Sequence, residues 1–279
     1  MRTSDRVLKN VLLGRSPSRA SRLRTAPPPL QVVILAAGMG TRLGRSTPKP
    51  LTSLASGQTI LHRQLDNVQQ VLGPQVPVTI VVGFQADVVR QAVPRADPEI
   101  GFAHNEHYHR TNTSKSLLRG LESAPKGAVL WLNGDVVFDP AILEHVRPLI
   151  EADVSFVCVN TARVAEEEIK YTVDEDGYIA ELSKTVAAGL GEAVGINYVS
   201  RRDRDTLAHY LRLAGDGDYF ERGMELAIEA GHLRFLPVDI SAYSAVEVDV
   251  EDDLAHANAR LFGVGVAVED VPDVDGLAG

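Results

Sequence analysis

Apolar residues in the first half of this 279-residue chain form short continuous runs separated by amphipathic stretches. Short runs rich in Val, Ile and Leu are typical of buried strands, whereas apolar residues spaced three or four apart predict helices. The pattern predicts strands at 32–35, 78–82 and 129–132, and helices at 60–72, 86–93, 114–123 and 140–150. Strands that alternate with helices favour a parallel sheet with right-handed crossovers, which binds ligands at the carboxyl ends of its strands.

The second half of the chain has shorter and more closely spaced strands. They are predicted at 154–159, 169–173, 178–182, 196–199, 233–237 and 245–248, with helices at 203–213, 218–230 and 251–261. The run Asp174-Glu175-Asp176-Gly177 predicts a turn between two of these strands. We therefore expect an α/β fold: a Rossmann-like, mostly parallel sheet flanked by helices, with a small strand-rich extension that covers the ligand cleft.

Composition divides the chain into three parts. Residues 1–30 hold seven basic residues and one acidic residue, and they are rich in Arg, Ser and Pro, which predicts a flexible basic leader. The same composition suits an organellar transit peptide, a solvated tail or an over-long start. Residues 31–265 are predicted to form the folded domain, and residues 266–279 an acidic, frayed tail.

Charge and hydropathy exclude several classes of function. The net charge is −9, and the basic leader leaves the rest of the chain more acidic still, so we expect no nucleic-acid partner. No apolar stretch approaches 18 residues, so no membrane span is predicted. The single cysteine, Cys158, cannot form an intramolecular disulfide; its apolar run predicts a buried position. The cytosol is the default compartment for such a chain.

A glycine-rich segment follows the first predicted strand and carries the clearest chemical signal. It reads Leu35-Ala36-Ala37-Gly38-Met39-Gly40-Thr41-Arg42-Leu43, with Pro48-Lys49-Pro50-Leu51 close behind. Small residues let the backbone approach a phosphate chain, and Arg42 and Lys49 supply positive charge. The spacing of Gly38, Gly40 and Gly44 does not fit the Rossmann dinucleotide pattern, and the sequence has no Gly-Lys-Ser or Gly-Lys-Thr triplet of a P-loop.

Two acidic positions are candidates for a metal site. Asp135 ends the apolar run that begins at Leu130, where a carboxylate projects into the crevice and suits Mg²⁺. Strand alternation places Glu247 and Asp249 on one face, and two like charges there favour a divalent cation. In the alternative interpretation, Asp135 caps the next turn, and 247–253 is a solvated acidic strand end that leads into a helix.

The glycine-rich segment and the Pro-Lys-Pro-Leu that follows it resemble the signature of nucleotidyltransferases of the sugar-phosphate pyrophosphorylase superfamily. Residues 105–117 resemble a stretch of bacterial phosphocholine cytidylyltransferases and their inositol-phosphate relatives, from Asn105 and Tyr108 to Asn112, Ser116 and Leu117. Matching pieces recur up to about residue 262. The hexapeptide repeats of the acyltransferase domain that some relatives carry are missing from this sequence.

The resemblance implies a nucleotide-diphospho-sugar transferase type of fold for 31–265 and a role for individual residues. The implied nucleotide-binding residues are Leu35, Ala36, Ala37, Gly38, Gly40, Thr41, Gly83, Asn112 and Thr113. Asn112 and Thr113 also suit helix capping. The implied catalytic residues are Lys49, Arg42 and Asp135. Mg²⁺ is expected at Asp135 and Asp249, with Glu247 as a further ligand.

The implied acceptor-binding residues are Lys184, Asn197, Tyr198 and Tyr219. Lys184 departs from the family pattern, in which a glutamate directly precedes the lysine, because Glu181 lies three positions upstream. Its alternative is a solvated strand-end lysine. The histidines at 104, 107 and 109 match no zinc spacing, and we expect them to be surface or packing residues.

These inferences predict a Mg²⁺-dependent nucleotidyltransferase. It would transfer a nucleotidyl group from a nucleoside triphosphate, with CTP favoured, to a phosphorylated small alcohol, amino alcohol or phosphonate, and release pyrophosphate. Three alternatives stay open: the same chemistry on a hexose 1-phosphate with another nucleotide, a non-catalytic nucleotide sensor of the same fold, and a Rossmann oxidoreductase. The sequence leaves the oligomeric state open.

Overall fold

The computed structural model describes residues 29–40, 47–93, 99–162 and 164–263. The predicted leader, except for its last two residues, and the predicted tail lie outside these ranges. The fold is built on a nine-stranded sheet whose main path runs β10-β6-β9-β4-β1-β2-β3. These strands are β10 (Leu236–Asp239), β6 (Phe156–Asn160), β9 (Glu192–Val199), β4 (Ala128–Asn133), β1 (Leu30–Ala36), β2 (Val78–Val82) and β3 (Ile100–His104).

Only β9 runs antiparallel to its neighbours on this path, so the expectation of a mostly parallel sheet is confirmed. The strands β7 (Lys170–Val173) and β8 (Ile179–Ser183) form an antiparallel hairpin that joins the sheet beside β9. This hairpin is the predicted strand-rich extension, and its turn lies at the predicted position, residues 174–177.

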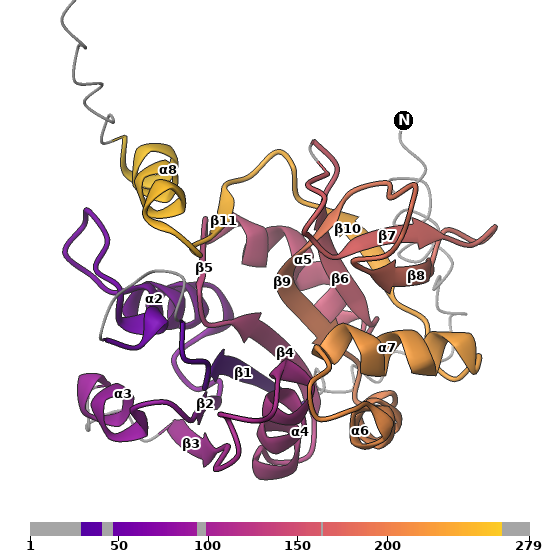
Figure 1. Cartoon of the computed structure of the whole chain (residues 1–279), viewed down its shortest axis with the longest axis horizontal. Coiled ribbons are helices and arrows are strands. Elements are labelled where there is room, and N and C mark those ends of the chain that lie inside the picture. Colours follow the sequence, from indigo (N-terminus) through magenta and orange to yellow (C-terminus); the bar gives the residue numbers. More distant parts are fainter. Residues whose placement is uncertain (1–28, 41–46, 94–98, 163, 264–279) are drawn as a thin grey trace, which may run out of the picture.

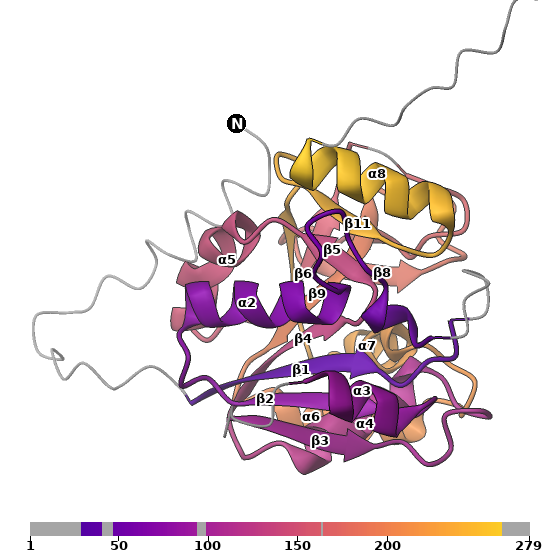
Figure 2. The ribbon, with the colours of Figure 1, turned by 90° about the vertical axis from the view of Figure 1, so that its left-hand side faces the viewer.

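Helices cover both faces of the sheet, with α2 and α5 on one side and α4 and α6 on the other (Figures 1 and 2). The first layer contains α2 (Ile60–Leu72), α3 (Ala86–Ala92) and α5 (Ala141–Glu151). The second contains α4 (Thr113–Ser123), α6 (Arg204–Leu213) and α7 (Phe220–Glu229). Among the described residues, the helices are all too short or too polar to span a bilayer.

Strand β1 shows why its sequence is apolar without interruption from Val32 to Ala36. Val32 and Ile34 belong to the core under α2 and α5, and Val33 and Leu35 to the core under α4 and α7. Because neighbouring side chains of a strand point to opposite faces, a central strand covered on both sides must be apolar at every position. Cys158 on β6 is fully buried in the first of these cores, as predicted.

A second, two-stranded sheet lies beside the main one and carries the late acidic residues. Strand β5 (Val136–Phe138) pairs antiparallel with β11 (Ala245–Glu247), and helix α8 (Glu251–Phe262) packs over them. Val246 and Val248 are buried in this small core. The Asp253 carboxylate accepts hydrogen bonds of 2.9 Å from the backbone N–H groups of Asp249 and Val250, which fixes the entry into α8.

The hydrophobic pattern does not predict two of the strands, β3 and β5, and it places a third, β10, a few residues too early. β3 is an edge strand in which Gly101, Phe102 and His104 are exposed, so it lacks an apolar run. β5 has only three residues, and its partner β11 lies more than a hundred residues away along the chain. The predicted strand 233–237 is observed at Leu236–Asp239, because it must align with β6 in the sheet.

Gly134 joins the carboxyl ends of β1 and β4. Its backbone N–H donates a 3.0 Å hydrogen bond to the Leu35 carbonyl oxygen. A Cβ atom at this position would lie only 2.4 Å from that oxygen, closer than any unstrained contact. A glycine is therefore required for the two strand ends to meet.

We predict that Gly134→Ala lowers the free energy of unfolding by about 1–3 kcal/mol, because the strand ends must separate to admit the methyl group. The measurement is urea unfolding monitored by circular dichroism. Gly217→Ala is the matched control, since nothing lies within 4 Å of a Cβ atom built there. Equal stability of the two variants would contradict the close approach.

Candidate active site

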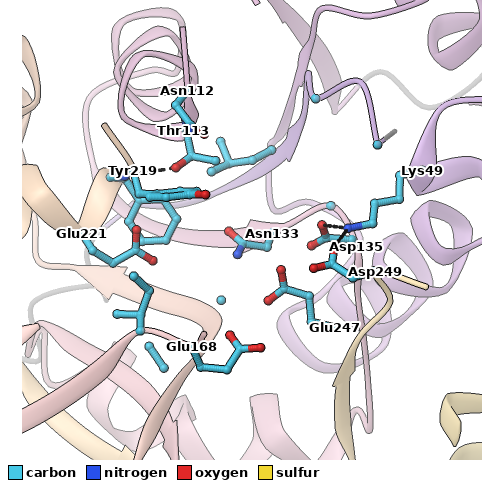
Figure 3. A pocket seen from close by; sticks show the side chains of 18 of the residues that line it. Lys49, Asn112, Thr113, Asn133, Asp135, Glu168, Tyr219, Glu221, Glu247 and Asp249 are labelled. Carbon is cyan, nitrogen blue, oxygen red and sulfur yellow. Dashed lines mark hydrogen bonds and ion pairs between the residues drawn. The ribbon is translucent and has the colours of Figure 1, made fainter. Parts of the chain in front are cut away.

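A cavity of about 500 Å³ opens at the carboxyl ends of β1 and β4. Its wall combines these strand ends with the first turns of α4 and α7, the residues that flank the hairpin β7–β8, the start of β9 and the end of β11. This is the position expected for a ligand site in a parallel sheet. In Figure 3 the cavity has two sides, one formed by Lys49, Asp135, Glu247 and Asp249, the other by Tyr219 and Glu221.

The glycine-rich segment lies along one edge of this cavity. Leu35, Ala36, Gly38 and Gly40 line it, as predicted for a backbone that approaches a ligand. Gly40 has a positive φ of 57°, and a Cβ atom there would lie 2.9 Å from the Cβ of Lys49. The segment therefore packs directly against the lysine that follows it.

Two residues that were predicted to bind the nucleotide, Ala37 and Gly83, do not line the cavity. The Ala37 carbonyl accepts a 3.0 Å hydrogen bond from the backbone N–H of Phe84. Gly83 lies so close to that carbonyl and to Tyr108 that a Cβ atom would meet both within 2.7 Å. Both residues support the position of the segment. Thr41 and Arg42 lie outside the described residues, so their predicted roles stay predictions.

Lys49 begins a single 3-10 turn (Lys49–Leu51) between two buried prolines, Pro48 and Pro50. Its ammonium donates a 2.8 Å hydrogen bond to Oδ2 of Asp135 and a second to Oδ1 of Asp249. Burial alone would lower the pKa of Lys49, but the two aspartates outweigh it and raise the pKa above its ordinary value. The lysine is therefore a permanent cation held in one place.

Asp135, Glu247 and Asp249 form the cluster that the sequence predicted. One carboxylate oxygen from each lies within 4.8 Å of the others. Repulsion from Asp135, burial, and the charges of Glu168 and Asp249 raise the pKa of Glu247 well above its ordinary value, and Lys49 lowers it only in part. Oδ1 of Asp135 is buried with no hydrogen-bond partner among the described residues. One ammonium does not balance three carboxylates, so the cluster fits a divalent cation with oxygen ligands.

Asn112 and Thr113 line the cavity at the first turn of α4. The Asn112 side chain caps the helix, since it accepts a 2.8 Å hydrogen bond from Thr113 N–H and donates one of 3.2 Å to the Gly217 carbonyl. The Thr113 hydroxyl accepts a 3.1 Å hydrogen bond from Phe220 N–H. Both side chains thus join α4 to the start of α7, and both remain at the cavity surface.

The predicted acceptor residues separate into two pairs. Lys184 and Tyr219 both line the cavity, and the Lys184 ammonium lies 5.0 Å from the centre of the Tyr219 ring. Asn197 and Tyr198 are buried in β9 and are not among the residues that line it. Tyr198 stacks on Phe156 and donates a 3.0 Å hydrogen bond to Asp153, so its ring belongs to the core.

Several lining residues were not predicted as site residues. They are Pro50, Asn133, Gly134, Glu167, Glu168, Ile169, Ala193, Gly195, Phe220 and Glu221. Asn133, Gly134, Phe220 and Glu221 are neighbours of predicted residues and could have been found by extending those motifs. Glu167 and Glu168 belong to an acidic run that reads as a solvated surface segment, so no signal distinguishes them.

Glu221, the second residue of α7, is the most unusual of these residues. Its side chain is only 7% exposed, and Oε2 has no hydrogen-bond partner among the described residues. Burial raises the pKa of Glu221 from an ordinary 4.5 to about 7, although its own backbone N–H and Lys184 favour the charged form. The histidines 104, 107 and 109 do not belong to any metal-ligating group in the described part of the chain.

Comparison with known proteins adds an independent line of evidence. The chain matches the family described as the MobA-like NTP transferase domain over residues 32–235. It is 30% identical over 251 residues to a CMP-5'-(3-aminopropyl)phosphonate synthase from Streptomyces rubellomurinus. That alignment covers 84% of this chain but 39% of the relative, so the chain spans well under half of the relative's length.

Two solved structures have the same fold. One is CTP:phosphocholine cytidylyltransferase (LicC) from Streptococcus pneumoniae, with a TM-score of 0.61 and 16% identity over 82% of this chain and 97% of that one. The other is the inositol-1-phosphate CTP transferase from T. maritima, with a TM-score of 0.67 and 13% identity over 86% and 99% of the two chains. At these identities the likeness shows the fold alone, and it confirms the predicted fold class.

The raised pKa of Glu221 leads to a prediction for stability. The folded protein holds the Glu221 proton more tightly than the unfolded chain, so the stabilisation is complete below pH 4.5 and is lost as the pH rises to about 7. Glu221→Gln removes this loss. The variant should therefore be more stable than the parent at pH 8, by up to roughly 3 kcal/mol, with a smaller difference at pH 5.

Thermal unfolding of both proteins at pH 5, 6, 7 and 8 measures this difference. Glu229→Gln, on the exposed part of the same helix, is the control and should show no such trend. A difference in Tm between Glu221→Gln and the parent that stays constant from pH 5 to pH 8 would refute the raised pKa.

Proposed function

The chain belongs to the MobA-like NTP transferase domain family, and from this premise we propose that it is a nucleotidyltransferase that couples a nucleoside triphosphate to a phosphorylated small molecule. The observation that carries the proposal is the joint placement of Lys49, Asp135 and Asp249 beside the glycine-rich segment. A triphosphate brings a chain of negative charge, and this arrangement offers backbone, cation and metal-ligating oxygens together.

In the proposed reaction, an oxygen of the acceptor's phosphate or phosphonate attacks the α-phosphorus of the nucleotide. The bond from that phosphorus to the oxygen that bridges to the β-phosphorus breaks, and pyrophosphate leaves. A phosphate oxygen is already an anionic nucleophile, so no general base is required. Catalysis then consists of positioning and charge neutralisation.

The residues of this chain have separate tasks in that reaction. The backbone from Leu35 to Gly40 lies along the cavity and would hold the phosphate chain. Lys49 is kept protonated and in place, and it would donate to the oxygens on which charge grows. Lys184 would bind the acceptor's phosphate, and Arg42 is proposed as a second cation for the triphosphate.

We propose Mg²⁺ as the cation of the carboxylate cluster, with Asp135 and Asp249 as ligands and Glu247 as a third. Bound there, it would neutralise the charge of the triphosphate and of the departing pyrophosphate. The chemistry of the donors supports this assignment, since all three are carboxylate oxygens and one oxygen of Asp135 is buried with no partner in the part of the chain that the structure describes.

CTP is the proposed nucleotide, and a phosphorylated amino alcohol, alcohol or phosphonate the proposed acceptor. The name of the Streptomyces relative contains both CMP and an aminoalkyl phosphonate, and two of the structures with this fold are described as CTP enzymes. Other structures with this fold are described as a putative glucose-1-phosphate thymidylyltransferase and a UDP-glucose pyrophosphorylase. A hexose 1-phosphate with another nucleotide is the competing substrate pair, and the test below includes it.

The proposal is tested by measuring pyrophosphate release with each of the four ribonucleoside triphosphates. Each is combined with an aminoalkyl phosphonate, phosphocholine, inositol 1-phosphate and glucose 1-phosphate in the presence of Mg²⁺. Acceptor-dependent release is expected, fastest with CTP and an amino-alcohol phosphate or phosphonate. Nucleotide binding without release for any acceptor would identify a sensor instead.

Asp135→Asn tests the carboxylate cluster. The change removes one charge at nearly constant volume, so the fold should persist while kcat falls about 100-fold or more. Asp87→Asn is the control, because Asp87 lies on α3 with an 86% exposed side chain, away from the cavity. Turnover close to that of the parent at saturating Mg²⁺ would remove Asp135 from the active site.

Lys49→Ala separates transition-state stabilisation from substrate binding. If the ammonium contacts charge that grows only during the reaction, kcat should fall about 100-fold or more, while KM for the nucleotide changes little. Steady-state kinetics at several nucleotide concentrations measure both constants. Unchanged kcat with a raised KM would assign Lys49 to ground-state binding only.

A further inference from the structure

Glu221 lies on the side of the cavity opposite the carboxylate cluster, and its carboxylate points into the space between them (Figure 3). The proposed reaction leaves it without a task. A carboxylate that is only 7% exposed is costly to bury in its charged form, and a buried, unpaired carboxylate in a cavity wall is a candidate for a functional group. We therefore ask which group of a bound ligand would form a hydrogen bond or ion pair with Glu221.

An ionised Glu221 carboxylate can only accept hydrogen bonds, so the partner that it lacks among the described residues is a hydrogen-bond donor. Oε2 of Glu221 is fully buried and accepts no hydrogen bond from any described residue. Lys184 acts on Glu221 only through its charge at a distance, since no ion pair joins the two among the described residues. The cost of an unsatisfied buried acceptor is recovered when a ligand supplies an N–H or O–H group.

The surroundings of Glu221 restrict the size and charge of that group. The preceding residue, Tyr219, is 39% exposed at the cavity wall, whereas Phe220 packs edge-on against Trp131, with ring centres 5.6 Å apart. The Glu221 carboxylate thus shares the cavity wall with Tyr219, while Phe220 anchors the first turn of α7 in the core. A compact cation with several N–H donors fits better there than a large neutral group.

We propose that Glu221 determines acceptor specificity: its buried carboxylate binds the protonated primary amine of a short aminoalkyl phosphate or phosphonate. The inference rests on the proposed function and narrows its acceptor class. In this arrangement the acceptor is dipolar, with its phosphate at Lys184 and its ammonium at Glu221. A primary ammonium offers three N–H donors, whereas a quaternary ammonium offers none and a hydroxyl carries no charge.

The test compares acceptors within one protein, so a partial loss of folded enzyme does not change the result. The first series contains aminoalkyl phosphates with two to four carbons, and the second contains alkyl phosphates in which a methyl group replaces the amine. Phosphocholine adds a charge without N–H donors. For each compound, kcat/KM for pyrophosphate release is measured with CTP and Mg²⁺ on the full chain, on Glu221→Gln and on the control Glu229→Gln.

The parent and the control should prefer the best aminoalkyl phosphate over its methyl counterpart by about tenfold to a hundredfold, and over phosphocholine as well. Glu221→Gln should lose this preference, mainly through a raised KM for the amine, while its activity on the methyl counterpart is kept. Preservation of the preference in Glu221→Gln, or its absence in the parent, overturns the inference and leaves the proposed function standing.

A binding measurement decides the case in which no acceptor supports transfer and the proposed function itself fails. Isothermal titration of the same aminoalkyl phosphates into the parent and Glu221→Gln then compares affinities directly. At least tenfold weaker binding to the variant supports the amine site, and equal binding refutes it. The two failures are therefore distinguishable.

Discussion

The ammonium of Lys49 joins side chains from three parts of the chain that are far apart in sequence. Asp135 and Asp249 lie 86 and 200 residues away from it in sequence, and both bind its Nζ. The three segments arrive from the glycine-rich end of β1, the end of β4 and the end of β11. Carboxylates brought this close repel one another, so their cluster requires a cation. The lysine supplies part of that charge, and the rest is left for a divalent ion.

The two sides of the cavity differ in how their charge is balanced. On one side the carboxylates share an ammonium and fit a metal ion, which suits a site that must receive a triphosphate. On the other side Glu221 is buried, its Oε2 has no hydrogen-bond partner within the described ranges, and burial raises its pKa to about 7. Such a group lowers the stability of the folded protein as the pH rises above 4.5, so the fold alone gains nothing from it. In the proposed acceptor site, the ligand and not the protein supplies the partner of this carboxylate.

Most strands and helices and part of the candidate site could be predicted from the sequence, because they depend on the local order of residues. The apolar runs and helical periodicities locate most strands and helices, and alternation in β11 correctly places Glu247 and Asp249 in the cavity, opposite Val246 and Val248. The joint position of Lys49 and Asp135 follows from the rule that ligands bind at the ends of parallel strands. The family resemblance was needed to recognise these positions as one site.

The features that could not be predicted from the sequence depend on contacts between segments far apart in the chain. Asn197 and Tyr198 were both expected at the acceptor, yet they are neighbours on β9 and so face opposite sides of the sheet, with Tyr198 stacked on Phe156. The burial of Glu221 arises only when α7 packs its first turn against Trp131. Gly83 supports the glycine-rich segment through Tyr108 and Ala37, a contact that no local pattern contains.

The most direct test of the central claim is a crystal structure of the full chain with Mn²⁺ and a non-hydrolysable CTP analogue, in which anomalous scattering locates the metal. We predict a single anomalous peak, coordinated by oxygens of Asp135, Asp249 and the phosphate chain. The phosphate chain should lie along the backbone from Leu35 to Gly40, and Lys49 should donate a hydrogen bond to one of its oxygens. A metal bound away from these aspartates, or a nucleotide that does not touch this segment, would contradict the proposed active site.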